Sequence, residues 1–241
     1  MLRLLPDSIL SLVYPQECEV CHDEVESPDD GNACSDCWAK TRIFAGTETL
    51  CNKCGAFLFG GGASRDGLRC RKCEEDNYER AFAVGIYEHA LSTSVLHLKR
   101  TPHIPRRLKT LLADAFDRIP ANRDITIIPV PLSLRRRRER GFNQAAIIAE
   151  IVANHVGAVA DEMSLVRKLH TPMHRAGMDR KARSLTVKHA FEVVRPKLIE
   201  NRNVLLVDDV FTSGETASMC AGVLKRSGAA TVNVLTIARA A

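Results

Sequence analysis

The sequence predicts an α/β protein in which helices flank a mostly parallel sheet, with a smaller cysteine-rich module in front of that sheet. From residue 81 onward, strand-like and helix-like segments alternate, which is typical of a parallel sheet with crossover helices. Eight of the nine cysteines lie before residue 74. Residues 1–80 hold 9 Lys and Arg against 15 Asp and Glu, whereas residues 81–241 hold 25 against 14. These three observations predict two modules, residues 1–80 and residues 81–241.

The overall composition is that of a globular protein. Hydrophobic residues make up 45% of the 241 positions and charged residues 26%, which excludes extensive disorder and fibrous repeats. No run of 18 apolar residues occurs, so no membrane span is expected. The first apolar stretch, Met1–Val13, is broken by Pro6 and Asp7, so it predicts a short amphipathic helix rather than a signal peptide. We therefore expect a cytoplasmic protein.

Four apolar segments of the second module predict strands. The segment ITIIPV is apolar and rich in β-branched residues, as strands buried on both faces of a parallel sheet are. The other three segments are similar in length and hydrophobicity. The expected strands are Ala81–Tyr87, Ile125–Val130, Asn203–Val210 and Thr231–Ala238.

Helical segments separate these strands. Within Pro105–Ile119 the apolar residues recur at helical spacing, and the proline stands near the start, where its missing N–H costs nothing. Asn143–His155 carries a similar apolar set, and the stretch around Ser92–Leu98 is also typical of a helix. A further helix is expected between the last two strands, with Gly228 ending it.

The clustered cysteines form four pairs with two residues between the members of each pair. Such a turn points two sulfurs at one place, and two turns complete the tetrahedron that Zn²⁺ accepts from thiolates. Four turns therefore predict two closed, structural Zn²⁺ sites in a double zinc-ribbon module. The expected ligands are Cys18, Cys21, Cys34, Cys37, Cys51, Cys54, Cys70 and Cys73.

A disulfide framework and a redox pair are the alternatives to zinc. Disulfides are disfavoured because no secretory signal precedes the cysteines, and a redox pair normally occurs singly. The spacing is compatible with two connectivities. Sequential closure leaves shorter loops and is favoured, whereas a cross-brace would alternate the pairs.

The stretch VLLVDDVFTSGET, which begins at Val204, carries the strongest chemical signature. A buried strand delivers Asp208 and Asp209 to its carboxyl end, and a loop of small and hydroxylic residues then opens a helix. The N–H groups of a helix N-terminus bind phosphate, whereas carboxylates beside them suit hydroxyls or a metal. The pattern therefore predicts a phosphorylated ribose with Mg²⁺; the alternative is an ordinary helix cap. The expected contacts are Asp208, Asp209, Thr212, Ser213, Gly214, Glu215 and Thr216.

This stretch resembles the phosphoribosyl pyrophosphate motif of type I phosphoribosyltransferases. A second match is PVPLSLRRRRERGFNQ, over residues 129–144, and with the four cysteine pairs it is similar to the ComF family of competence-associated, amidophosphoribosyltransferase-like proteins. Gly177, Arg180, Arg183 and Ala190–Phe191 match a third family pattern, although Thr186 replaces its usual asparagine. The family's LKY-x-G stretch is present only as LKR, at residues 98–100. The resemblance implies a type I phosphoribosyltransferase-like fold.

Arginines are concentrated just beyond the expected strand that ends at Val130. By resemblance, this segment is the pyrophosphate loop, and a second mobile loop around residues 174–183 closes over the ligand. Guanidinium groups suit that task because each donates two hydrogen bonds to phosphate oxygens at once. A solvated basic turn and a nucleic-acid contact are the other interpretations of the run. The expected anion contacts are Arg135, Arg136, Arg140, Arg175 and Arg183.

Three functions follow from these features. The first is a phosphoribosyltransferase with an unknown acceptor, in which Asp208 and Asp209 orient the ribose and one of them is the general base. The second is a regulator that binds phosphoribosyl pyrophosphate without turnover. The third, implied by the association with competence, is an accessory protein for single-stranded DNA or for a DNA-uptake or helicase partner.

Overall fold

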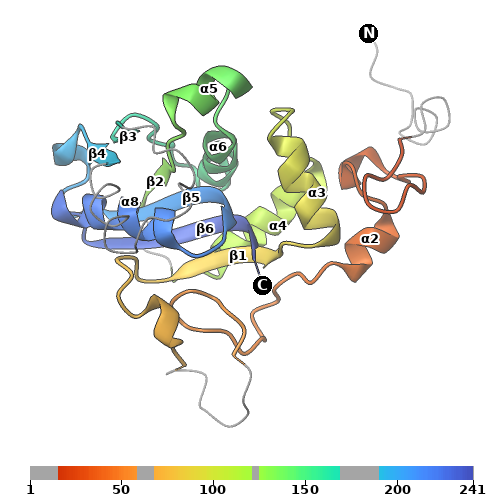
Figure 1. Cartoon of the computed structure of the whole chain (residues 1–241), viewed down its shortest axis with the longest axis horizontal. Helices are drawn as coiled ribbons and strands as arrows, with labels where there is room; N and C mark the ends of the chain where they lie inside the picture. The colour runs from red at the N-terminus through yellow and green to blue at the C-terminus, as the bar shows by residue number, and fades with distance from the viewer. Residues whose placement is uncertain (1–15, 59–67, 121–124, 169–189, 241) are drawn as a thin grey trace, which may run out of the picture.

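A computed structural model describes residues 16–58, 68–120, 125–168 and 190–240. Its centre is a four-stranded parallel sheet in the order β1-β6-β5-β2 (Figure 1). The predicted strands are confirmed, each within one or two residues of its expected ends. The strands are β1 (Ala81–Ile86), β2 (Ile125–Pro129), β5 (Asn203–Phe211) and β6 (Thr231–Arg239).

Helices cover both faces of this sheet. The residues of β5 alternate between the faces, so Leu205 and Val207 belong to one buried cluster and Val204 and Leu206 to the other. This two-sided burial explains the continuous apolar runs of the strands. On the Leu205 face lie α3 (His89–Leu98), α4 (Arg106–Asp117) and α6 (Gln144–Val156); on the Val204 face lie α8 (Glu215–Arg226) and the antiparallel pair β3 (Leu165–Arg167) and β4 (Phe191–Val193).

The cysteine-rich segment meets the sheet along the free edge of β1. Ile43 forms an antiparallel bridge with Gly85, and the N–H of Phe44 donates to the carbonyl oxygen of Val84 at 2.8 Å. A Cβ atom on Gly85 would lie 2.2 Å from the carbonyl oxygen of Arg42, so only glycine allows this approach. The segment therefore satisfies backbone groups that an open edge strand would expose.

The remaining short elements belong mainly to the cysteine-rich segment and to connections. Cysteines of the first cluster share a buried cluster with α3 and α4, and cysteines of the second share one with α8. The division at residue 80 stays a prediction. The short elements are η1 (Pro28–Asp30), α2 (Ser35–Lys40), η2 (Arg71–Cys73) and η3 (Pro196–Leu198).

The structure differs from expectation in the basic segment after β2. Where the resemblance implies a loop, residues Leu134–Arg140 form a short helix, α5. Ser133 caps its first turn by accepting from the N–H of Arg136, and Gly141 ends it in the left-handed conformation at φ 79°. These caps and the helix propensity of arginine outweigh the repulsion within the run. The β3–β4 pair was also not predicted. The expected Met1–Val13 helix lies outside the described residues.

Within the described part of the chain, no helix is both long and apolar enough to cross a membrane.

Candidate metal centres and phosphate-binding site

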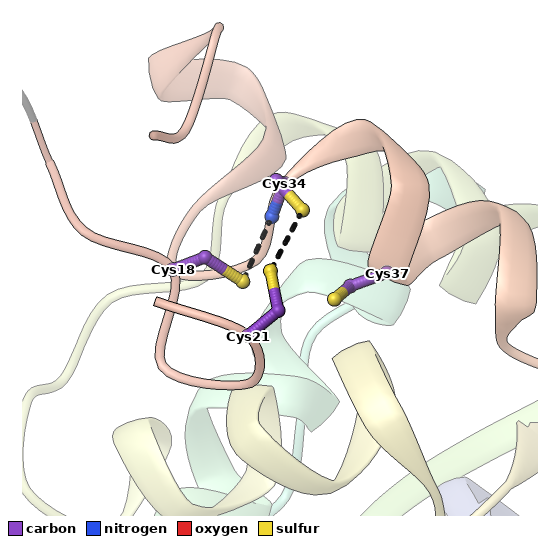
Figure 2. A group of neighbouring side chains, drawn as sticks. All are labelled: Cys18, Cys21, Cys34 and Cys37. Carbon is purple, nitrogen blue, oxygen red and sulfur yellow. Dashed lines mark hydrogen bonds between the residues drawn. The ribbon is translucent and has the colours of Figure 1, made fainter. Parts of the chain in front are cut away.

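The first four cysteines gather at one point beside the start of α2 (Figure 2). Their Sγ atoms all lie within 4.8 Å of one another, and those of Cys21 and Cys34 are 3.5 Å apart. Tetrahedral Zn²⁺ with Zn–S bonds of about 2.3 Å places its sulfurs about 3.8 Å apart. Burial opposes ionisation of Cys18, but N–H donors of Cys34, Cys21 and Val20 outweigh it and lower the pKa of its thiol to about 6. The donor set therefore fits zinc.

The second four cysteines repeat this geometry. The Sγ–Sγ distances are 3.6 Å from Cys51 to Cys73 and 3.5 Å from Cys54 to Cys70. Each cluster takes its ligands from consecutive pairs, so the favoured sequential connectivity is confirmed and the cross-brace is excluded. Neither cluster includes a non-cysteine ligand among the described residues, and four thiolates leave no open coordination position for catalysis.

The acidic pair lies within β5, just beyond the end of the neighbouring β2. Pro129, the last residue of β2, pairs with Val207, so Asp208 is the first residue of β5 without a β2 partner. On the other side β6 continues, with Thr236 opposite Asp208. Adjacent strand residues point to opposite faces, and the two carboxylates therefore have different environments.

Asp209 faces α3 and α6. Its Oδ2 atom lies 3.4 Å from Nζ of Lys99 and accepts a hydrogen bond from Nε2 of Gln144 at 3.2 Å. Asp209 and Gln144 are 8% and 4% exposed. Because a charged donor and an amide donor converge on one oxygen, this carboxylate is held in a fixed orientation.

Asp208 faces the opposite side, toward Cys220 and Arg167. Burial first, and then the charge of Asp209, raise the pKa of its carboxyl to about 8, although the N–H of Asp209 donates to its Oδ1 at 2.9 Å. The pair thus combines one carboxylate fixed by two donors with one whose raised pKa lets it exchange a proton near neutral pH. That division suits general acid–base chemistry.

The predicted phosphate loop forms a turn at the start of α8. Gly214 is its N-cap at φ 78°, and a Cβ there would lie 2.7 Å from Cζ of Phe211. Thr212 and Ser213 are exposed, and Ser213 Oγ accepts from the N–H of Glu215 at 3.4 Å. The helix N-terminus and the two exposed hydroxyls lie just after the acidic pair in the chain, as the sequence predicts. This is an arrangement that can bind phosphate.

The expected anion contacts divide between α5 and segments outside the described residues. Arg135 pairs with Glu139 at 2.7 Å, one turn away on α5. Arg136 is close enough to Arg167 for its charge to lower the pKa of that guanidinium, after the larger effect of burial. Arg140 has a buried Nη1 without a hydrogen-bond partner within the described residues. Arg175 and Arg183, with the expected mobile loop, lie outside the described residues.

Three residues beside the acidic pair were not among the expected contacts. Gln144 lies in the GFNQ motif, and its buried Oε1 also has no hydrogen-bond partner in the part of the chain described. Lys99 lies in the LKR remnant of a family motif, so both had a sequence signal. No sequence pattern pointed to Arg167, whose guanidinium lies 5.2 Å from the ring centre of Phe191.

The residues just after the second cysteine cluster pack against the predicted phosphate loop and α8. Nδ2 of Asn77 donates to the carbonyl oxygen of Ser218 in α8 at 3.1 Å. Tyr78 is 1% exposed, packs edge-on against Phe211, and donates its hydroxyl to Asp76 at 2.6 Å. The chain that follows the last zinc ligand is therefore fixed to α8 and to the end of β5.

Comparison with known proteins matches the cysteine-rich segment to a zinc-ribbon family. The model of the double zinc ribbon domain matches residues 9–75. The DNA utilization protein YhgH of Shigella flexneri is 30% identical over 238 residues, covering 95% of this chain and 99% of the relative. The chain belongs to the ComF/YhgH family. In this family, competence protein F of Haemophilus influenzae is 26% identical over 92% of this chain and 96% of its own length.

Two solved structures show more distant similarity to this ComF/YhgH protein. One is an allosteric regulatory enzyme of purine biosynthesis, with a TM-score of 0.37 and 19% identity over 63% of this chain and 26% of that chain. The other is the glutamine phosphoribosylpyrophosphate amidotransferase of B. subtilis, with a TM-score of 0.36 and 16% identity over 61% of this chain and 26% of that chain.

Proposed function

We propose that this ComF/YhgH protein binds phosphoribosyl pyrophosphate with Mg²⁺ and transfers the phosphoribosyl group to an acceptor. The observation that carries the proposal is the acidic pair of β5 followed directly by the glycine-capped N-terminus of α8. The helix N-terminus and the hydroxyls of Thr212 and Ser213 bind the 5′-phosphate, and the carboxylates bind the ribose hydroxyls. Arginines of α5 bind the pyrophosphate.

The pair of carboxylates also offers oxygen ligands of the kind that Mg²⁺ accepts together with substrate phosphates. When bound, Mg²⁺ neutralises charge on the pyrophosphate. Asp209, fixed by Lys99 and Gln144, orients the ribose. The bond from the anomeric carbon to the pyrophosphate oxygen breaks as the acceptor nitrogen bonds to that carbon, and Asp208, in its ionised form, accepts the proton that the nitrogen releases.

Calorimetric titration with phosphoribosyl pyrophosphate and Mg²⁺ tests binding. We expect the double variant Asp208→Asn/Asp209→Asn to bind at least about 10-fold more weakly, because hydrogen bonds from two ribose hydroxyls are lost. Asp117→Asn, an exposed carboxylate on α4, is the matched control and should bind as the parent does. Absence of binding by the parent chain would exclude the proposal.

Turnover is tested separately, by pyrophosphate release in the presence of a panel of bases and amines. Release that requires Mg²⁺ and an acceptor, and that is lost in the double variant, supports transfer. Tight binding without release across the panel would instead support the regulator that binds without turnover.

A second function, handling of single-stranded DNA, is favoured by the surface of α5. Arg135, Arg137 and Arg138 are exposed on this helix, and relatives of the chain are named for DNA utilization and competence. Each phosphate contact on single strands contributes about −0.7 to the slope of log affinity against log salt. We expect Arg135–Arg138→Ala to reduce that slope, whereas Arg106→Gln on α4 should not. A flat salt dependence of the parent would exclude this function.

A further inference from the structure

A cavity of about 420 Å³ lies between the second cysteine cluster and the edge of the sheet. We call it the ribbon pocket. Its walls come from the cysteine-rich segment, the start of β1, the end of α4 and the ends of β5 and β6. None of the acidic pair or of residues 212–216 lines it, so it is distinct from the proposed phosphoribosyl site. Its volume is in the range of sites that bind small molecules.

Three arginines have their guanidinium groups at the wall of the ribbon pocket. Arg80 Nε donates to the carbonyl oxygen of Asn52 at 3.0 Å, and Arg239 Nη1 donates to that of Cys54 at 2.6 Å. Arg118 Nη2 donates to the carbonyl oxygen of Ala83 at 2.9 Å. Each acceptor residue also lines the pocket, so the backbone holds each charged group in place there.

Among the described residues, most of the donors on these arginines have no acceptor. A guanidinium has five N–H donors, and each of the three uses one or two of them on backbone oxygens. Within the described residues none forms an ion pair, although Glu48 and Asp114 act on Arg118 from a longer distance. Both carboxylate oxygens of Glu48 already accept from the N–H groups of Ala45 and Gly46. Counting only the part of the chain that the structure describes, the pocket therefore offers hydrogen-bond donors without matching acceptors.

Phenyl rings form the apolar part of the ribbon pocket, from Phe44, Phe82 and Phe211. Two of them already lie beside cations: Arg80 is 5.4 Å from the ring centre of Phe82, and Arg239 is 5.3 Å from that of Phe211. Aromatic and guanidinium planes together favour a flat ring as a ligand.

The net charge around the ribbon pocket limits the charge that a bound ring can carry. Three arginines and Glu48 give the walls a net charge of +2, but a zinc centre with four thiolates carries −2 and lies behind Cys51 and Cys54. The two contributions cancel, so the pocket has no excess charge to attract a polyanion. Its donors favour instead a neutral or singly charged ligand that is rich in acceptor oxygens.

We propose that the ribbon pocket binds a planar heterocycle with carbonyl oxygens, of the nucleobase class. The carbonyl oxygens accept from Arg80, Arg118 and Arg239, and the ring packs against the phenyl groups. Binding here does not depend on the acidic pair, and the proposal therefore stands apart from the proposed function.

The zinc-loaded full chain is titrated by calorimetry with uracil, urate, adenine and inorganic phosphate. Uracil is a neutral ring with two carbonyls, urate is a singly charged ring with three, and adenine has none. We expect urate and uracil to bind, and adenine to bind at least about 10-fold more weakly because it cannot accept through oxygen. Equal binding of phosphate, or equal binding of adenine, would overturn the proposal.

Variants then locate the binding. Arg80→Gln and Arg118→Gln should each weaken urate binding at least about 10-fold, since each removes charged donors. Arg106→Gln, exposed on α4, is the matched control. The double variant of the acidic pair should bind urate like the parent. Zinc content is measured for every variant. Phe82→Leu removes an aromatic ring from the wall of the pocket and leaves the arginines unchanged, and it should also weaken urate binding. Unchanged binding in all three pocket variants would exclude this pocket as the site.

Discussion

The two cysteine clusters are each built from two pairs of cysteines with two residues between the members, and their ligand geometry is alike, but they pack against different parts of the molecule. The first adjoins α3, where Glu19 accepts from Thr93 at 3.0 Å and from Arg100 at 2.9 Å. The second adjoins α8 and the end of β5, through Asn77 and Tyr78. One metal centre therefore stabilises the side of the sheet covered by α3 and α4, and the other stabilises the side covered by α8, where the predicted phosphate loop begins.

This difference teaches that two repeats of one motif need not have the same importance for ligand binding. Both clusters are connected to the acidic pair, but through different contacts. The first acts through α3, whose C-cap Lys99 contacts Asp209. The second acts through Phe211, which packs against both Tyr78 and Gly214. Because the phosphate loop has its packing contacts on the second side, that side should be the more sensitive.

The largest expected effect is the loss of one zinc centre. Cys54→Ser and Cys21→Ser change equivalent positions in the two clusters. We expect Cys54→Ser to weaken binding of phosphoribosyl pyrophosphate at least about 10-fold, and Cys21→Ser to weaken it less than about 3-fold. Calorimetry with parallel measurement of zinc content checks both. Equal losses of affinity would show that the two clusters support the site equally.

The next effect concerns the segment between the clusters, which pairs with β1. In Gly85→Ala the new Cβ would lie 2.2 Å from the carbonyl oxygen of Arg42 and 2.8 Å from Leu91, so the pairing must open. We expect a loss of about 3 kcal/mol in the free energy of unfolding, measured with urea. An unchanged midpoint would mean that the segment is not held by β1 in solution.

A smaller effect is expected at the phosphate loop itself. Gly214→Ala and Gly157→Ala both place a Cβ in the left-handed region, at φ 78° and 71°, but only the first meets neighbouring atoms. Gly157→Ala should cost about 1 kcal/mol from backbone strain, and Gly214→Ala about 2 kcal/mol because Phe211 must also move. Urea unfolding of the pair separates the two causes. Equal costs would argue against tight packing beneath the loop.

A variant of Lys99 tests the connection through α3 between the first cluster and Asp209. Lys99→Met keeps the length of the side chain but removes the charge beside Asp209. We expect affinity for phosphoribosyl pyrophosphate to change about 3- to 10-fold, with little change in stability because the pair is partly exposed. Lys109→Met on the exposed side of α4 is the control. No change in affinity would remove Lys99 from the site.

The smallest effect is expected at the far side of the first cluster. Arg107 lies 4.9 Å from the ring centre of Trp38 and pairs with Asp30 at 3.0 Å. Arg107→Gln should lower the free energy of unfolding by about 1 kcal/mol and leave ligand affinity unchanged. A large change in affinity would contradict the separation of the two sides.

The sequence was most informative where one physical cause dominates. Cysteine spacing predicted both clusters, because four thiolates at one metal leave few alternatives. Continuous apolar runs predicted all four parallel strands, since burial on two faces admits little else. The turn at Gly214 was also predictable, because a glycine directly before a helix usually forms the turn that begins it.

Tertiary contacts decided the rest. The arginine run was expected to be a loop, but Ser133 and Gly141 cap it as a helix. Gln144 lies 65 positions before Asp209 in the sequence, and no local sequence pattern predicts the hydrogen bond between them. The three arginines of the ribbon pocket are equally scattered along the chain, and only the packing of the second cluster on the sheet brings them together.

The strand order has a consequence for how the chain acquires its structure. Of the strands that the structure describes, β6 alone pairs with β1 within the sheet, about 150 residues later, so during synthesis β1 cannot join the sheet until that strand has left the ribosome. Such a high contact order predicts slow folding and a long interval in which apolar strand edges are exposed to other chains. The segment beside Gly85 can pair with β1 much earlier, and it would then shield that edge while the rest of the sheet is still being made.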